Sequence, residues 1–275
     1  MNNLYNEPPA EQSRFIIPDY SSSSFTNEDL MDDMDGLQLR LQRVKIPAGG
    51  VLQFEMPGED LENPEYVPVL EGVILFNHPA NSYWPEGNEY DDNTPPLCQA
   101  VTGKMGYGDP GGICEACAYN RFGSGLNGGK ACKNMRMLYL LRSGDFMPVQ
   151  LTLPPTSLTS YRDFANWAFL LQKRPVYSGV VQIALRRETG NGFTYSVATF
   201  KKLYNFEGEE LAQISAIAKT FREQMKLLLN DRASYNRAAA EELAAEIVKP
   251  KALPDNNAHF EVGSLVDGER EPLPA

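Results

Sequence analysis

The stretch "VYSGVVQIALRRETGNGFTYSVATFKKL", residues 176–203, decides the fold class of this chain. Two runs rich in Val, Ile, Tyr and Phe flank the turn sequence at residues 189–192, and this combination predicts an antiparallel β-hairpin. Alternation along the second run places Phe193 and Tyr195 on the same face. We therefore expect a mainly β protein built around this hairpin.

The rest of the chain adds short strands and a few helices. Apolar residues recur at helical spacing after residue 157, which predicts a helix. Either Ser157 or Thr159 could cap it. The same spacing predicts that Trp167 lies in the core. Because strands do not alternate regularly with helices, we expect an OB-like β-barrel, closed and small, rather than a parallel β-α-β sheet. The other predicted strands lie within residues 37–47, 49–57, 66–79 and 136–155, and the predicted helices within residues 157–174 and 207–248.

The composition divides the chain into four regions. No apolar run is long enough to span a membrane, and the start "MNNLYNEPPAEQ" lacks the features of a signal peptide, so we expect a cytoplasmic protein with no membrane contact. The predicted regions are a flexible acidic segment (1–35), an OB-like barrel (36–206) with an insertion at about 77–135, C-terminal helices (207–249), and a disordered acidic tail (250–275).

The charge is distributed unevenly around a net value of −11. Residues 98–206 hold 13 Lys and Arg against 5 Asp and Glu, net +8, whereas residues 1–97 hold 4 against 18 and residues 207–275 hold 8 against 13. A basic centre between acidic ends favours a polyanionic partner for the centre. The alternative is that each region is simply solvated by its own charges.

The four cysteines lie in one region, with the spacing C-x15-C-x2-C-x14-C: Cys98, Cys114, Cys117 and Cys132. Thiolates are favoured ligands of Zn²⁺, and four of them form a closed, structural site without an open position for water. The spacing therefore predicts a structural zinc ion that orders the long loop. The alternatives are four unrelated buried thiols, or His78 in place of one cysteine, although we expect His78 to be an ordinary loop or core residue.

Enzyme motifs are missing from the sequence. A zinc deaminase needs H-x-E followed by P-C-x-x-C, but His78 is followed by Pro79 and Ala80, and Ile113 precedes Cys114. The sequence also contains no P-loop, no H-E-x-x-H and no G-x-S-x-G. We therefore expect a protein that is not an enzyme.

Cations and aromatic rings alternate through the basic centre. A groove that binds single-stranded nucleic acid combines cations for phosphates with aromatic faces for bases, so this centre predicts such a groove. The alternative is that the rings are core residues and the cations are merely solvated. The candidate nucleic-acid contacts are Lys104, Tyr107, Tyr119, Arg121, Phe122, Lys130, Lys133, Arg136, Arg142, Arg186, Arg187, Tyr195, Lys201 and Lys202.

Several segments resemble an uncharacterised family found in bacteriophages, prophages and integrative conjugative elements: "NHPANSYW" (77–84), "PPLC" (95–98), "GGICEACAYNRFGSG" (111–125), "GKACKNMRMLYLL" (129–141) and "LPPTSL" (153–158). In outline the chain is also similar to phage single-stranded DNA-binding proteins, in which an OB barrel carries a zinc-binding insertion and an acidic tail. Some of those proteins use a histidine where this chain offers a cysteine.

The second resemblance implies sequence-independent binding of single-stranded DNA during replication or recombination in a bacterial cell. Single-strand binders often carry an acidic C-terminal tail that competes with DNA for the basic groove and offers a docking peptide, so the tail of this chain favours docking of replication or recombination proteins. The alternative is that the tail serves only solubility. The tail lacks the aspartate-rich run ending in Pro-Phe of cellular bacterial single-strand binders, which puts docking onto their usual partners in doubt. The alternative function is a phage protein-interaction module that inhibits or redirects a host protein.

Overall fold

The structure is a computed structural model that describes residues 14–20, 41–58, 63–85, 94–125, 128–190 and 192–248, with α-helical side chains described as far as residue 234. The predicted acidic tail lies outside these residues, as does most of the predicted N-terminal segment. Among the described residues, no helix combines the length and the apolar character needed to cross a membrane.

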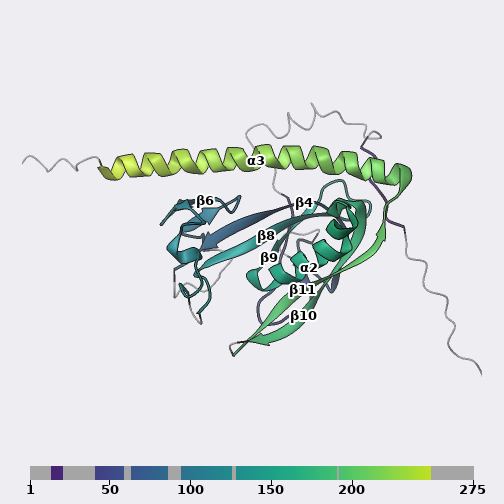
Figure 1. Cartoon of the computed structure of the whole chain (residues 1–275), viewed down its shortest axis with the longest axis horizontal. Helices are drawn as coiled ribbons and strands as arrows, with labels where there is room; N and C mark the ends of the chain where they lie inside the picture. The colour runs from purple at the N-terminus through teal and green to yellow at the C-terminus, as the bar shows by residue number, and fades with distance from the viewer. Residues whose placement is uncertain are drawn as a thin grey trace, which may run out of the picture.

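A nine-stranded mixed sheet forms the body of the protein (Figure 1). Its main path runs β1-β9-β8-β4-β5-β6-β7, with β10 paired to β4 and β11 paired to β10. Only the β1–β9 pair is parallel among the pairs described. The strands are β1 Arg43–Val44, β4 Val69–Tyr83, β5 Cys98–Ala100, β6 Met105–Gly108, β7 Gly112–Ile113, β8 Cys132–Leu141, β9 Val149–Leu153, β10 Gly179–Gly190 and β11 Phe193–Asn205. A separate small sheet pairs β2 Phe54–Met56 with β3 Glu65–Val67.

The long strand β4 joins the two halves of the sheet. Its first residues pair with β10 and the rest pairs with β8, with a register irregularity between Ile74 and Phe76. Gly72 lies where these pairings meet, and a Cβ there would lie 2.3 Å from the carbonyl oxygen of Leu141. A glycine is therefore required for the close approach of β4 and β8.

The mainly β class and the predicted hairpin are confirmed, since β10 ends at Gly190 and β11 begins at Phe193. The closed barrel is wrong. Within the described part of the chain, β11 pairs with β10 alone and the second neighbour of β9 is β1, so the sheet stays open between β9 and β11. The physical reason is that helix α2 covers the edge of β11 in place of a strand.

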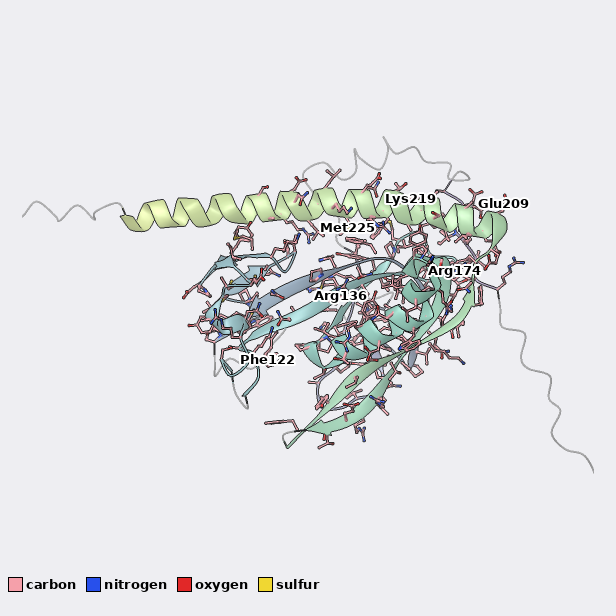
Figure 2. All side chains as sticks on the ribbon, in the orientation of Figure 1. Phe122, Arg136, Arg174, Glu209, Lys219 and Met225 are labelled. Carbon is pink, nitrogen blue, oxygen red and sulfur yellow. The ribbon has the colours of Figure 1, made fainter. Side chains whose placement is uncertain are left out.

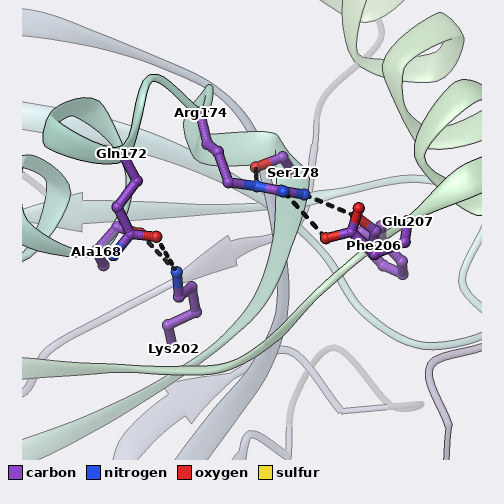
Figure 3. A network of polar contacts seen from close by, with 7 residues as sticks. All are labelled: Ala168, Gln172, Arg174, Ser178, Lys202, Phe206 and Glu207. Atoms are coloured by element: carbon purple, nitrogen blue, oxygen red, sulfur yellow. Dashed lines mark hydrogen bonds and ion pairs between the residues drawn. The ribbon is translucent and has the colours of Figure 1, made fainter.

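Helix α2, Leu158–Ala168, follows the short 3-10 helix η3, Pro155–Ser157, and packs against β11. The Ser157 side chain makes no capping bond to α2; its hydroxyl oxygen instead accepts the backbone N–H of Ala198 in β11, 2.9 Å away. The Lys202 ammonium donates to Ala168 O and to Gln172 Oε1, at the other end of α2 (Figure 3). Side-chain hydrogen bonds thus link α2 to β11 at the edge where strand pairing ends.

The prediction that Trp167 lies in the core is wrong, because this side chain is 73% exposed. The buried stripe of α2 runs through Tyr161 and Ala165, and Trp167 falls outside it. After α2 the chain continues through two 3-10 helices, η4 Leu170–Gln172 and η5 Val176–Ser178, into β10.

Two apolar cores lie on opposite faces of the sheet. The first lies between the sheet and α2, and it contains Ile74, Leu138 and Ile183. The second lies between the other face and helix α3, and it contains Val73, Leu141 and related side chains. Figure 1 shows α3 running along the molecule on the side opposite to α2. The central strands are therefore buried on both faces.

Helix α3, Gly208–Val248, is one continuous helix of 41 residues where the sequence predicted more than one. The guanidinium of Arg174 fixes its start by donating to Phe206 O at 2.7 Å and to Glu207 Oε1 at 3.0 Å (Figure 3). Phe15 also packs there, edge-on to Phe206 and only 7% exposed. Residues 14–20, within the segment predicted to be flexible, thus dock onto the second core.

Candidate nucleic-acid interface and cysteine cluster

The insertion between β4 and β8 carries the cysteines. β4 extends to Tyr83 and β8 starts at Cys132, so the two ends of the predicted insertion, residues 77–135, belong to long strands. Between them, β5 pairs with the end of β4, and β6 and β7 continue the sheet. A 3-10 helix, η1 Ala118–Asn120, follows the C-x-x-C turn.

All four cysteines line one cavity of about 10 Å³: Cys98, Cys114, Cys117 and Cys132. The thiols are free, and a space of this size is close to that of a single water molecule. Burial, and then the neighbouring thiols, raises the pKa of Cys132 to about 11. Within the described ranges, no group of three or more His, Cys, Asp or Glu side chains is arranged as a metal site.

The backbone around the cluster suits a closely packed ion. A Cβ on Gly106 would lie 2.7 Å from Cys98 Sγ, so only glycine fits beside this thiol. The C-x-x-C turn is closed by a 3.4 Å bond from Cys117 N to Cys114 O, and Asn120 Nδ2 donates to the same carbonyl at 2.7 Å. The two thiols of the C-x-x-C pair therefore lie on one tight turn, whose carbonyl is held by the Asn120 side chain.

Aromatic and basic side chains gather on the same insertion. Tyr119 stacks on Tyr83 at the end of β4, with ring centroids 4.4 Å apart. Phe122, labelled in Figure 2, is 83% exposed. The Lys130 ammonium lies 5.2 Å from the ring centre of Phe122. The other predicted contacts that the structure places on the insertion or at the start of β8 are Lys104, Tyr107, Arg121 and Lys133.

The remaining predicted contacts lie elsewhere on the sheet. Arg136 is directed to the α2 side, where Nε donates to Asn77 Oδ1 at 2.7 Å and the guanidinium lies over the Tyr161 ring. Arg142 forms an ion pair with Asp145 at 2.7 Å after the end of β8. These two cations therefore have partners within the protein.

The hairpin carries the last group of predicted contacts. Arg187 Nε donates to Gly50 O at 2.9 Å, and Arg186 pairs with Glu188. Tyr195 is half-buried near the tip, Lys201 is exposed, and Lys202 is engaged with α2. The fourteen predicted residues consequently fall on the insertion, the end of β8 and the hairpin, rather than on one continuous strip.

A groove that the sequence did not reveal lies between the outer face of the sheet and α3. It has a volume of about 460 Å³. Among the described residues that form it, the charged ones are Arg43 and Arg232, and none is an Asp or a Glu. Those residues are Leu41, Arg43, His78, Ala80, Ser82, Trp84, Thr94, Pro95, Pro96, Gln99, Val101, Met135, Met137, Tyr139, Gln150, Thr152, Leu229 and Arg232.

Strand alternation builds the floor of this groove. His78 on β4 is paired with Met137 on β8, next to Tyr139 on the same face. This alternation is visible in the sequence, but only the register of β4 and β8 shows that these side chains share a face. The position of α3 over them depends on tertiary packing.

His78 and Tyr139 form a buried polar pair in the floor. His78 Nδ1 lies 2.9 Å from Pro79 O, which can only accept, so Nδ1 carries the proton and Nε2 accepts the Tyr139 hydroxyl, 3.0 Å away. Burial lowers the pKa of His78, and burial raises the pKa of Tyr139 to about 12, with Arg232 opposing the latter. His78 does not line the cysteine cavity.

Comparisons with protein-family models, with curated proteins and with solved structures find no match for this chain. The resemblance to phage and mobile-element proteins therefore stays a prediction from the sequence segments alone.

Proposed function

We propose that this chain is a non-enzymatic single-stranded DNA-binding protein with a structural Zn²⁺ ion in its cysteine cluster. The observation that carries the proposal is the convergence of all four cysteines on one ion-sized cavity beneath an insertion rich in exposed cations and rings. Cys98, Cys114, Cys117 and Cys132 would hold the metal once their side chains turn into the cavity. The metal supplies a rigid support, and the insertion presents the nucleic-acid contacts.

The connectivity of the sheet supports an OB-type origin. The strand order along the chain is β4, β8, β9, then α2, then β10 and β11, and β4 pairs with both β8 and β10. A five-stranded OB-fold has this arrangement, with its first strand between the second and the fourth, and it is commonly only partly closed. In this chain the opening lies between β9 and β11 and is covered by α2.

The experiment is oligonucleotide binding by natively purified protein, with labelled oligo-dT over a series of salt concentrations and with metal content measured in parallel. We expect about one zinc per chain, binding that weakens steeply with salt, and little preference among base sequences. The double variant Arg121→Glu with Lys133→Glu should weaken binding by roughly tenfold or more, because both cations are exposed on the insertion.

The matched control is Lys226→Glu, which changes one exposed cation on α3 outside the insertion. It should bind oligo-dT like the parent chain. Absence of any binding at low salt would contradict the proposed function, whereas binding without zinc would contradict only the metal assignment.

A second candidate function, protein binding, rests on a different observation. Trp167, Leu170 and Leu171 are 73%, 55% and 66% exposed around the end of α2, and they form an apolar surface. Large apolar side chains grouped on a surface are typical of protein contacts. Failure to bind oligo-dT at low salt, with the chain folded and zinc present, would favour this function over DNA binding.

A further inference from the structure

We propose that the groove between α3 and the outer face of β4, β8 and β9 binds a short segment of single-stranded nucleic acid. The inference rests on the proposed function and extends it, because none of the fourteen candidate contacts listed from the sequence lines this groove. It assigns a second contact region, distinct from the insertion, and gives α3 the role of its roof.

Charge is the first argument. The chain has a net charge of −11, yet among the described residues the charged side chains lining the groove are Arg43 on β1 and Arg232 on α3. A concave site lined by cations inside an acidic protein concentrates the field on an anion that enters it. The phosphate group of a nucleotide is such an anion, and guanidinium groups bind it bidentately.

The uncharged lining is the second argument. Trp84 is oriented by a 2.9 Å hydrogen bond from its indole Nε1 to Thr94 O, and it lines the groove, whereas the Tyr139 ring is buried in the floor. Met135 and Met137 add polarisable apolar surface in the floor. Bases stack on aromatic rings regardless of sequence. The uncharged lining can therefore pack against a base while the arginines bind a phosphate.

Size and enclosure form the third argument. A volume of about 460 Å³ lies in the range of small-ligand pockets, roughly 300–1,000 Å³, and is far too small for a duplex. It therefore suits a nucleotide or two of a single strand. The floor is a sheet and the roof is a helix, so a flexible strand must enter along the groove.

The described part of α3 is anchored both along the second core and beside the groove. Ile214 and Ala218 are fully buried in the second core, and Phe221 packs edge-on to Tyr139 with ring centroids 5.4 Å apart. Leu229 is buried farther along, beside the groove. Figure 1 shows α3 continuing past this point over the insertion. A strand held under α3 would thus pass toward the cysteine-bearing insertion, which joins the two contact regions.

The test uses the fluorescence of Trp84. The chain has two tryptophans, and Trp167→Phe removes the exposed one from α2. In the full-length Trp167→Phe protein, titration with oligo-dT should quench the emission of Trp84, with a midpoint that matches the gel-shift affinity. Free thymidine monophosphate at the same nucleotide concentration should quench much more weakly, because it lacks the contacts along a strand.

Charge reversal in the groove provides the second measurement. Arg232→Glu should weaken oligo-dT binding by roughly tenfold and reduce the salt-dependence slope by about one. Lys226→Glu, the same change on an exposed face of the same helix, should do neither. Circular dichroism of both variants checks that α3 is intact.

Three results would overturn the inference, and two of them leave the proposed function standing. One is oligo-dT binding by gel shift without any change in Trp84 emission. The other is an oligo-dT affinity of the Arg232→Glu variant that equals the affinity of the Lys226→Glu variant. Equal quenching by the monophosphate and the oligonucleotide would show a free-nucleotide site and would also overturn it. Absence of any oligo-dT binding at low salt would instead remove the proposed function on which the inference rests.

Discussion

The backbone N–H of Ala198 in β11 donates a hydrogen bond to the hydroxyl oxygen of Ser157, 2.9 Å away, and both residues are fully inaccessible to solvent. An edge strand has a row of unpaired backbone groups, and a buried one must find partners for them. The start of α2 supplies a partner here. This bond therefore replaces one link of the strand pairing that would close a barrel.

Ser157→Ala should lower the free energy of unfolding by about 1–3 kcal/mol, because the buried Ala198 amide would lose its acceptor. Thr159→Ala is the matched control: Thr159 is exposed, lies in the same turn, and was the other candidate cap. Urea unfolding of both variants measures the difference. Equal stability of the two variants would mean that water or a rearranged backbone satisfies Ala198 instead.

The contact of Phe15 with Phe206 leads to a second prediction. Phe15 is buried, its ring lies 5.7 Å from that of Phe206, and its backbone N–H donates to the Tyr204 hydroxyl at 2.8 Å. Phe15→Ala should therefore destabilise the protein by about 3 kcal/mol, at the lower end for a buried phenylalanine. Ile16→Ala, at a side chain that is 65% exposed, should change the unfolding free energy by less than about 0.5 kcal/mol.

Limited proteolysis gives an independent reading of the same contact. The Phe15→Ala variant should be cleaved within residues 14–20 faster than the Ile16→Ala variant, while the sheet stays resistant. If both variants are cleaved at the same rate, residues 14–20 do not stay docked in solution.

Local pattern predicted the parts of the fold that depend on neighbouring residues. The hairpin at β10 and β11 follows from β-branched and aromatic runs around a Gly-containing turn, and the confinement of the cysteines to one region pointed to one cluster. Both depend on residues close in sequence. The register of the hairpin needs no contact from the rest of the chain.

Tertiary packing decided the features that the sequence did not show. Trp167 fits the helical spacing of α2, yet it is 73% exposed because the buried stripe passes through Tyr161 and Ala165. The role of Ser157 depends on a strand amide 41 positions away. The groove brings Arg43 together with Arg232 from opposite ends of the chain. No local pattern encodes such pairs.

His78 makes the protein less stable in mild acid. Burial lowers its pKa in the folded state below the ordinary value of about 6.5, so the unfolded chain binds the proton more readily. The folded state is favoured fully above pH 6.5 and loses this advantage as the pH falls through that value. Protonated Nε2 would also face the hydroxyl of Tyr139, which now donates to it, with Arg136 and Arg232 adding positive charge nearby.

His78→Gln should reduce the difference between the unfolding free energies at pH 7.5 and pH 5.5. His259→Gln serves as the control, because His259 is the other histidine of the chain. Urea titrations at both pH values measure the effect. A parent chain whose stability is the same at pH 7.5 and 5.5 would show that His78 is protonated as easily when folded as when unfolded.

Removal of the metal that we propose in the cysteine cluster should melt the insertion and spare the two cores. The strands β5, β6 and β7 have only 3, 4 and 2 residues, and the buried side chains there are chiefly Ala100 and the thiols of Cys114 and Cys132. So small an apolar cluster stabilises little by itself. After chelation, the amides of Cys117 and Gly123 should lose their protection from hydrogen exchange. Both amides close turns of the insertion.

Leu140 and Ile183, fully buried in the first core, should keep their protection under the same treatment. Cys132→Ser should reproduce the exchange pattern of the chelated protein, and chelator should then have no further effect on the variant, since one lost thiolate leaves an open three-ligand site. If the insertion keeps its protection after chelation, the four thiols form a self-sufficient buried cluster. The basic and aromatic side chains around them would then be held in place without zinc.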